Sequence, residues 1–301
     1  MKITKEHMQK YIGENSDLIS VKKQAPGITV LKYKPKVFYK SLWTPELCEL
    51  RGTVVDDDFD IIQRPFTKIF NFGEKQAPAI HRDERVQAVT KVNGFMAACT
   101  FYKGQLFIST TGSINSDFVD LAKKRLKSLE LEKMISDYTH IFEITDPSDP
   151  HIIDEEHGAW LIGVREKSWE ADQCAFSEDD LDIIAKEIGA LRPKHYIFKS
   201  FQDLKNEVKT VNHEGFIVRT IDGRELKIKS PYYLISKFFG RKTEEKLSKM
   251  LDNPESTKQS IDEEYYLLID YLVYNRDKFI ALSEQERFKF VREFFERELL
   301  K

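Results

Sequence analysis

The sequence contains no run of about 18 apolar residues, the length that a membrane-spanning helix needs. Residues 1–7 also lack the apolar stretch of a secretory signal peptide. No Walker-type phosphate loop, no HExxH zinc motif, no internal repeat and no low-complexity segment occurs. These absences exclude a membrane partner and a Walker-type ATPase, and we expect a cytoplasmic location, or the host cytoplasm if the protein is viral.

Cysteine is scarce as well. The three cysteines, Cys48, Cys99 and Cys174, are odd in number and far apart in the sequence. This pattern excludes a disulfide framework and a structural zinc site, and it fits a reducing compartment. We interpret all three as ordinary thiols.

Charge and aromatic side chains are abundant. Charged residues make up 32% of the 301 residues, and 21 Phe and 12 Tyr provide material for a large core. A chain of this length exceeds the usual size of one core, so we expect two domains, or one large domain with a smaller attachment.

The segment from Ser20 to Pro45 is basic, with six lysines, no carboxylate and several interleaved aromatic residues. Such a segment suits phosphates and stacked bases. Alternatively, it is an exposed strand whose alternate lysines Lys32, Lys34 and Lys36 face water and protect a sheet edge. The sequence does not decide between these two interpretations.

Hydrophobic periodicity predicts a mixed fold. We expect helices at about 5–14, 117–131, 177–188 and 201–208, with strands dominating as far as 109 and at 140–144, 159–165, 215–220 and 225–228. Asp222-Gly223 is a good hairpin signal between the last two strands. Antiparallel strands with inserted helices indicate an α+β fold.

Beyond Pro231 the pattern becomes helical. We expect helices at about 234–250, 262–279 and 283–300, with a break around Pro254. Ser283 and Glu286 have the spacing of a capping box. The predicted domains are therefore residues 1–231 and a small all-α domain at 232–301.

A lysine lies three residues before a glycine in the stretch Lys91-Val92-Asn93-Gly94, between two β-type runs. A lysine at such a turn is either solvated or a nucleophile. The spacing alone does not decide, because K-x-x-G arises by chance in many chains.

Other motifs follow in a fixed order along the chain: RGTVV, RPFTKIFNFGE, KVNG, TGSINS, FEI, VRE, LRP, EGFIV and LKIKSPYYL. Through this ordered set the chain resembles the covalent nucleotidyltransferases, and most closely the phage-type RNA ligase 1 family. The match covers roughly residues 32–234. The resemblance implies a nucleotidyltransferase (ATP-grasp-like ligase) domain of antiparallel sheets, which would be residues 1–231.

The resemblance also implies catalytic roles for Lys91, Lys227 and Lys229. Lys91 would be the nucleophile. A lysine amine attacks only when it is deprotonated, so its pocket must disfavour the ammonium form. Lys227 and Lys229 share one side of a strand. We expect both to face the phosphates, to depress the pKa of Lys91 by like-charge repulsion, and to hold the α-phosphate.

Four further residues are implied to bind the nucleotide or a metal. Glu143 would hydrogen-bond the ribose, and Glu214 would hold hydrated Mg²⁺, with Mn²⁺ as an alternative. Arg51 and Lys68 would contact the β- and γ-phosphates. Taken alone, Glu143 and Glu214 could equally be surface ion-pair partners.

The remaining positions match less closely. Tyr33 would lie near the nucleotide, and Gly94 would let the backbone turn beside it. Asn93 departs from the aspartate that the family more often carries. Thr111 stands where the family has a basic residue, which puts one substrate contact in doubt. None of the seven histidines is assigned chemistry.

The implied reaction joins RNA ends with a 5′-phosphate and a 3′-hydroxyl, and tRNA is one candidate substrate. ATP would adenylylate Lys91, AMP would pass to the RNA 5′-phosphate, and the 3′-hydroxyl would displace it. We expect a monomer. A DNA ligase or capping enzyme would share the lysines and glutamates but usually adds a β-rich module. An RNA-binding module with an inactive nucleotide pocket is the alternative from another class.

Overall fold

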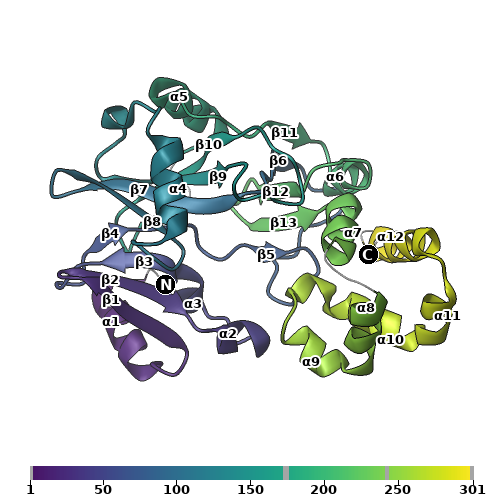
Figure 1. Cartoon of the computed structure of the whole chain (residues 1–301). Coiled ribbons are helices and arrows are strands. Elements are labelled where there is room, and N and C mark those ends of the chain that lie inside the picture. The colour runs from purple at the N-terminus through teal and green to yellow at the C-terminus, as the bar shows by residue number, and fades with distance from the viewer. Residues whose placement is uncertain (1–2, 172–175, 241–243, 299–301) are drawn as a thin grey trace. The chain divides into compact units, whose positions relative to one another are not determined.

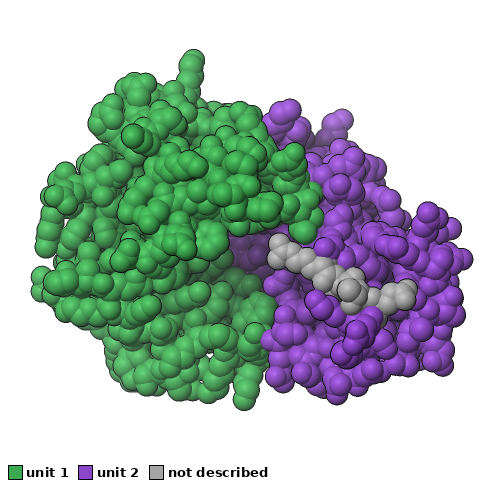
Figure 2. Space-filling model, in the orientation of Figure 1, with its two compact units in different colours: residues 1–68, 92–193 green, residues 69–91, 194–301 purple. Residues whose placement is uncertain are grey.

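The computed structural model of the chain describes residues 3–171, 176–240 and 244–298 (Figure 1). The chain forms two compact units, each assembled from two separate stretches of sequence (Figure 2). Unit 1 contains residues 1–68 and 92–193, and unit 2 contains residues 69–91 and 194–301. One crossing between the units falls directly after Lys91, and the predicted domain boundary after residue 231 lies within unit 2.

Unit 1 contains two four-stranded antiparallel sheets. The first has the order β1 (Ile19–Ala25), β2 (Ile28–Tyr33), β3 (Arg51–Val55) and β4 (Ile61–Gln63). The second has the order β10 (Gly158–Glu166), β9 (Tyr138–Thr145), β7 (Phe95–Tyr102) and β8 (Gln105–Thr110). The predicted strands at 140–144 and 159–165 are confirmed as β9 and β10, each slightly longer than expected.

Helices pack against these sheets. They are α1 (Lys5–Glu14), α2 (Pro35–Tyr39), α3 (Pro45–Glu49), α4 (Asp117–Leu126), η1 (Leu131–Lys133) and α5 (Glu178–Ile188). The Ser177–Asp180 capping box starts α5, and Gly189, with φ of +77°, ends it in the left-handed conformation that glycine adopts without cost. Leu181 and Ile188 on α5 are buried in the same core as α4. The two short helices α2 and α3 were not predicted; each carries proline in its first turn, where no backbone donor is lost.

A buried ion cluster ties α3 to β10. The carboxylate of Glu49 lies 3.2 Å from Arg64 Nε and 3.4 Å from Arg165 Nη1, and all three residues are buried. Burial alone would raise the pKa of Glu49, but the guanidinium charges of Arg165 and Arg64 outweigh it and hold the pKa below its ordinary value. The arginines of two motifs in the ordered set, Arg64 of RPFTKIFNFGE and Arg165 of VRE, therefore form buried ion pairs in the core of unit 1.

Unit 2 is built on a five-stranded sheet with the order β11 (His195–Phe198), β6 (Val86–Thr90), β12 (Gly215–Thr220), β13 (Glu225–Lys229) and β5 (Phe70–Asn71). Only the pairing of β13 with β5 is parallel. The predicted hairpin is confirmed: β12 and β13 pair through a turn at Asp222-Gly223, with φ of +83° at Gly223. Helix α6 (Phe201–Val208) packs its apolar side on this sheet.

The described part of the C-terminal region is helical, as predicted, but more finely divided. It contains α7 (Pro231–Phe239), α8 (Glu244–Asp252), α9 (Pro254–Lys258), η2 (Glu263–Tyr265), α10 (Tyr266–Tyr274), α11 (Arg276–Ala281) and α12 (Glu284–Glu298). The capping box before α12 is confirmed by hydrogen bonds in both directions between Ser283 and Glu286. The helix predicted at 262–279 was wrong as a single element, since Asn275 ends α10.

No helix in the described ranges is both long and apolar enough to cross a membrane. Cys48 and Cys99 are buried free thiols, and burial raises the pKa of both, that of Cys48 to about 11. This matches their interpretation as unreactive thiols. Cys174 lies outside the described residues.

His140 on β9 is completely buried in unit 1. Neither ring nitrogen has a hydrogen-bond partner within the described part of the chain. Burial disfavours the charged ring and lowers the pKa of His140 to about 4. The folded protein therefore keeps this imidazole neutral under conditions in which the unfolded chain binds a proton.

The pH dependence of stability follows from this difference. As the pH falls from 7 to 5, the unfolded state takes up the His140 proton first, so the wild type should lose about 2 kcal/mol of unfolding free energy relative to His140→Leu. Urea unfolding of both proteins at the two pH values measures the difference. His157→Leu is the control, because that side chain is exposed. Equal pH dependence in the wild type and His140→Leu would contradict the assignment.

Candidate active site

Three termini of neighbouring interior strands lie together at one end of the unit 2 sheet. Strand β6 ends at Thr90, opposite Phe216, and Gly215 at the start of β12 is paired with Lys229 at the end of β13. The Lys91 backbone N–H then donates to the Gly215 carbonyl over 2.9 Å. Strand pairing thus brings Lys91, Glu214 and Lys229 together, although 138 residues separate the first from the last.

Gly215 permits this arrangement. Its φ of +132° is one that other residues rarely adopt, and a Cβ atom there would lie 2.1 Å from the Ile228 carbonyl oxygen. Strands β12 and β13 therefore approach closely just beside Glu214. Because Gly215 directly follows Glu214, this close approach also determines the position of the Glu214 backbone.

The three side chains form a chain of ion pairs. Lys91 Nζ lies 2.9 Å from Glu214 Oε2, and Lys229 Nζ lies 3.7 Å from Glu214 Oε1. Exposure of the side chains is 2% for Glu214, 10% for Lys229 and 23% for Lys91. Lys91 is thus the member of this group most open to a reactant.

Burial alone would raise the pKa of Glu214, but the positive charges of Lys91, Lys229 and Lys227 outweigh it and hold the pKa below its ordinary value. Glu214 is therefore an anion at neutral pH. We expect Lys227 and Lys229 to depress the pKa of Lys91 by like-charge repulsion. The Glu214 carboxylate, which lies between Lys91 and Lys229, acts in the opposite direction.

Unit 1 contains the other predicted residues of the K-V-N-G and FEI motifs. The Gly94 backbone N–H donates to Glu143 Oε1 over 3.1 Å. A Cβ atom on Gly94 would lie 2.2 Å from the Ile144 carbonyl oxygen. Glycine is therefore required here by the close approach of β9.

Asn93 has a structural role that the sequence did not reveal. It is buried, its Oδ1 accepts from the Ile153 N–H, and its own N–H donates to Glu155 Oε1, both over 3.1 Å. Asn93 thereby fixes the position of the loop between β9 and β10.

Asn93 and residues of this loop line a cavity of about 350 Å³. Its lining includes the carboxylates of Asp146, Asp149, Asp154 and Glu155. So many carboxylates do not suit a phosphate, so we do not assign this cavity to a nucleotide.

Lys68 and Tyr33 belong to an aromatic cluster of unit 1. Lys68 Nζ lies 4.9 Å from the ring centre of Trp43 and 5.7 Å from that of Phe38. Trp43 in turn packs edge-on against Tyr33 at 4.8 Å. Cation–π contacts of this kind attract the Lys68 ammonium to the two ring faces and restrict its position.

Arg51 is placed by sheet pairing. It lies opposite Lys32 on the neighbouring strand β2, and like charges so placed are unfavourable unless an anion or water separates them. No carboxylate in the described ranges forms a salt bridge with either side chain. The two positively charged residues are therefore neighbours on the first sheet without a carboxylate between them.

The basic segment only partly fits its two interpretations. Strand β2 ends at Tyr33 and Lys36 lies on α2, so the predicted row of lysines on one strand was wrong. Lys36 pairs with Asp17 and Lys23 with Asp57, while Lys34 donates to the Ser16 carbonyl. Carboxylates from outside the segment thus neutralise part of its charge.

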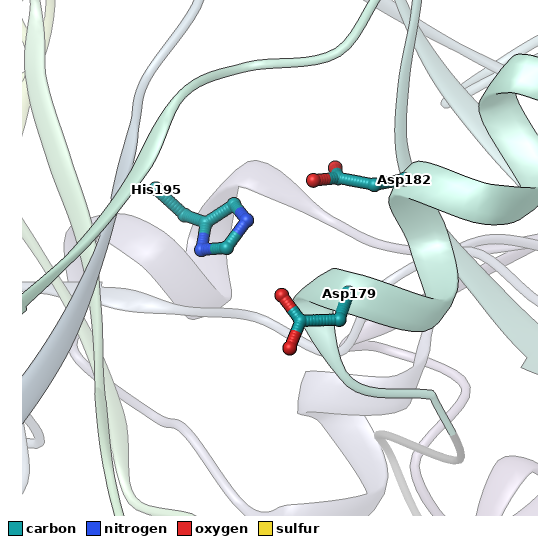
Figure 3. A group of neighbouring side chains, drawn as sticks. All are labelled: Asp179, Asp182 and His195. Carbon is teal, nitrogen blue, oxygen red and sulfur yellow. The ribbon is translucent and has the colours of Figure 1, made fainter.

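Figure 3 shows the side chains of Asp179 and Asp182 on α5 and of His195 at the start of β11. Asp182 accepts a hydrogen bond from Arg192 Nε over 2.7 Å, which explains its position without a metal. The two aspartates belong to unit 1 and His195 to unit 2, and we assign them no shared site.

The fold is that of ATP-dependent ligases. An "Archaeal ATP-dependent RNA ligase" structure superimposes with a TM-score of 0.59 and 16% identity, covering 97% of this chain and 75% of the archaeal chain. A "Putative ATP-dependent DNA ligase" from Aquifex aeolicus gives a TM-score of 0.60 at 14% identity, covering 98% and 78% of the two chains.

Sequence comparison defines the family. A family model described as RNA ligase matches residues 49–233, which include every predicted site residue except Tyr33. RNA ligase 1 of bacteriophage TS2126 is 31% identical over 155 residues, and the alignment covers 46% of this chain and 38% of the phage protein. The chain belongs to the RNA ligase family, although it spans well under half of that relative's length.

The close approach beside Glu214 makes a testable prediction. Gly215→Ala should lower the unfolding free energy by about 3 kcal/mol or more, because it combines an unfavourable φ with a steric clash. Gly223→Ala is the matched control: its φ is also positive, but no atom lies within 4 Å of its Cβ position. It should cost only about 1 kcal/mol. Urea unfolding measures both, and equal losses would rule out the close approach.

Proposed function

We propose that this protein is an ATP-dependent RNA ligase that joins a 5′-phosphate to a 3′-hydroxyl through a lysine-linked AMP. The observation that carries the proposal is the buried Glu214 carboxylate, which lies between Lys91 and Lys229 at the ends of neighbouring strands. Residues 1–231 would be the adenylyltransferase domain and residues 232–301 the helical C-terminal domain. The chain would act as a monomer on RNA.

In the first step the Lys91 amine attacks the α-phosphorus of ATP. Its lone pair forms the N–P bond while the bond from phosphorus to pyrophosphate breaks, and the amine proton passes to water. Lys91 must first leave its ammonium form, which Glu214 favours. We propose that a change in the charge around Glu214 on substrate binding releases that proton.

Glu214 fits a role as a metal ligand, because hard carboxylate oxygens are the donors that Mg²⁺ and Mn²⁺ prefer. Such an ion would neutralise charge on the phosphates when bound. Lys229 would hold the α-phosphate in the transition state with Lys227 beside it. Both lie on β13, and the pairing of β13 with β12 positions them.

The remaining contacts are proposed from the family. Arg51 and Lys68 would bind phosphate oxygens, and the cation–π contacts of Lys68 support this because they position its ammonium group. Glu143 would bind the ribose hydroxyls, with Tyr33 close to the nucleotide. For Asn93 and Gly94 the observed hydrogen bonds support a positioning role next to the nucleotide.

Radiolabelled ATP tests the first step. The wild type should acquire a covalent label, and Lys91→Ala should acquire none. The assay is run below the melting temperature of Lys91→Ala, because the variant leaves the buried Glu214 carboxylate without its Lys91 partner. Lys199→Ala, which removes an exposed lysine of the same unit, should be labelled normally. Full labelling of Lys91→Ala would show that another residue is the nucleophile.

The substrate is tested separately. Ligation is measured on 5′-phosphorylated single-stranded RNA, on nicked DNA duplex and on cleaved tRNA. The proposal predicts sealing of single-stranded RNA at least about tenfold faster than sealing of nicked DNA, a difference of about 1.4 kcal/mol in activation free energy. Faster sealing of cleaved tRNA than of single-stranded RNA would identify tRNA repair. Preference for nicked DNA would make the protein a DNA ligase instead.

A further inference from the structure

The C-terminal helical region supplies a carboxylate to one of the predicted catalytic lysines. Glu264, in η2, lies 2.7 Å from Lys229 Nζ through Oε2 and 2.9 Å through Oε1. The side chains of Glu264 and Lys229 are only 8% and 10% exposed. A bidentate ion pair this well buried restricts the lysine to one position far more than a surface pair does.

The pair continues the alternation of charge that begins at Lys91. Lys237 on α7 lies 3.4 Å from Glu264 Oε1 and pairs with Asp262 over 2.5 Å. The ring of Tyr233 lies beneath Lys229, with its centre 5.3 Å from Nζ. Positive and negative groups therefore alternate from the end of β6 to η2, all of them within unit 2.

Glu264 stands on a fixed segment. The buried Tyr265, the next residue, donates its hydroxyl to the Leu234 carbonyl on α7 over 3.0 Å. Its ring also contacts Phe238 of α7 and Phe295 of α12. The carboxylate is thus held by the packing of the helical region, and its position does not depend on Lys229 alone.

The donors of Lys229 show what Glu264 does. An ammonium has three N–H donors, and two of them are used by the two oxygens of Glu264. If Glu264 were absent, the nearest carboxylate would be Glu214 at 3.7 Å, which already binds Lys91. Both lysines would then compete for one carboxylate.

We propose that Glu264 is a positioning residue that fixes Lys229 beside β13 and leaves Glu214 to Lys91, so that the helical C-terminal region takes part in lysine adenylylation. This inference rests on the proposed function. It adds that the region contributes to the chemistry of the first step, before any RNA is bound.

Glu264→Gln tests the inference because glutamine keeps the shape and removes the charge. We expect the maximal rate of AMP transfer to Lys91 to fall about tenfold or more, with the KM for ATP changed less than about threefold, since a displaced Lys229 loses contacts made in the transition state. Single-turnover labelling with radiolabelled ATP over a range of concentrations separates the two constants.

Asp262→Asn is the matched control. It removes the same charge two residues away, from a side chain that is 52% exposed and pairs with Lys237. It should leave the maximal rate within about twofold of wild type. A rate for Glu264→Gln equal to that of Asp262→Asn would overturn the inference.

A double-mutant cycle shows whether Glu264 acts through Lys229. In a Lys229→Ala background, adding Glu264→Gln should cause little further loss, whereas independent effects would multiply and would overturn the inference. If Glu264→Gln does not fold, the same rates are measured for Glu264→Asp. Aspartate keeps the charge, but its shorter side chain moves the carboxylate away from Lys229. Absence of any label on the wild type would refute the proposed function itself, and a labelled wild type with an unaffected Glu264→Gln would refute only this inference.

Discussion

The ion pair between Lys91 and Glu214 is the interaction on which the rest of the site depends. Its two residues come from the two separate stretches of sequence that form unit 2, and the pairing of β6 with β12 brings them together. Breaking a buried pair of this kind leaves an uncompensated charge, which costs about 3–5 kcal/mol. Gly215 enforces the pair through its backbone, since no other residue fits so close to Ile228. Strand pairing and the backbone of Gly215 together place one amine beside one carboxylate.

This arrangement gives the lysine two conflicting requirements. The Glu214 carboxylate holds the amine in place but favours its protonated form, while nucleophilic attack needs the neutral form. Separate carboxylates for the two lysines reconcile placement with reactivity: Lys229 is held by Glu264 and Lys91 by Glu214. Negative charge that arrives with a phosphate substrate can then change one ion pair of this series, and no buried charged group is left without a partner. The C-terminal helices thus belong to the electrostatics of the site as well as to the core of unit 2.

Local sequence signals predicted much of the fold. Helix α1, the Asp222-Gly223 hairpin and the Ser283–Glu286 capping box follow from residues close in sequence, and the ordered motifs identified the family. Features set by distant contacts were missed. The ion pair of Glu264 with Lys229 joins residues 35 positions apart, and hydrophobic periodicity does not predict such a contact. The structural role of Asn93 depends in the same way on a loop some 60 residues later. The Glu214 carboxylate between Lys91 and Lys229 was missed as well, because strand period predicts which residues share a face, but not which carboxylate lies between them.

The central claim is that Lys91 is the one amine that this structure prepares for reaction with a nucleotide. The most direct measurement is mass-spectrometric mapping of the protein after incubation with ATP and Mg²⁺ in the absence of RNA. The account predicts a single AMP adduct, on the peptide that contains Lys91, which pyrophosphate removes by reversing the reaction. An adduct on Lys227, Lys229 or any other lysine, with Lys91 unmodified, would contradict it.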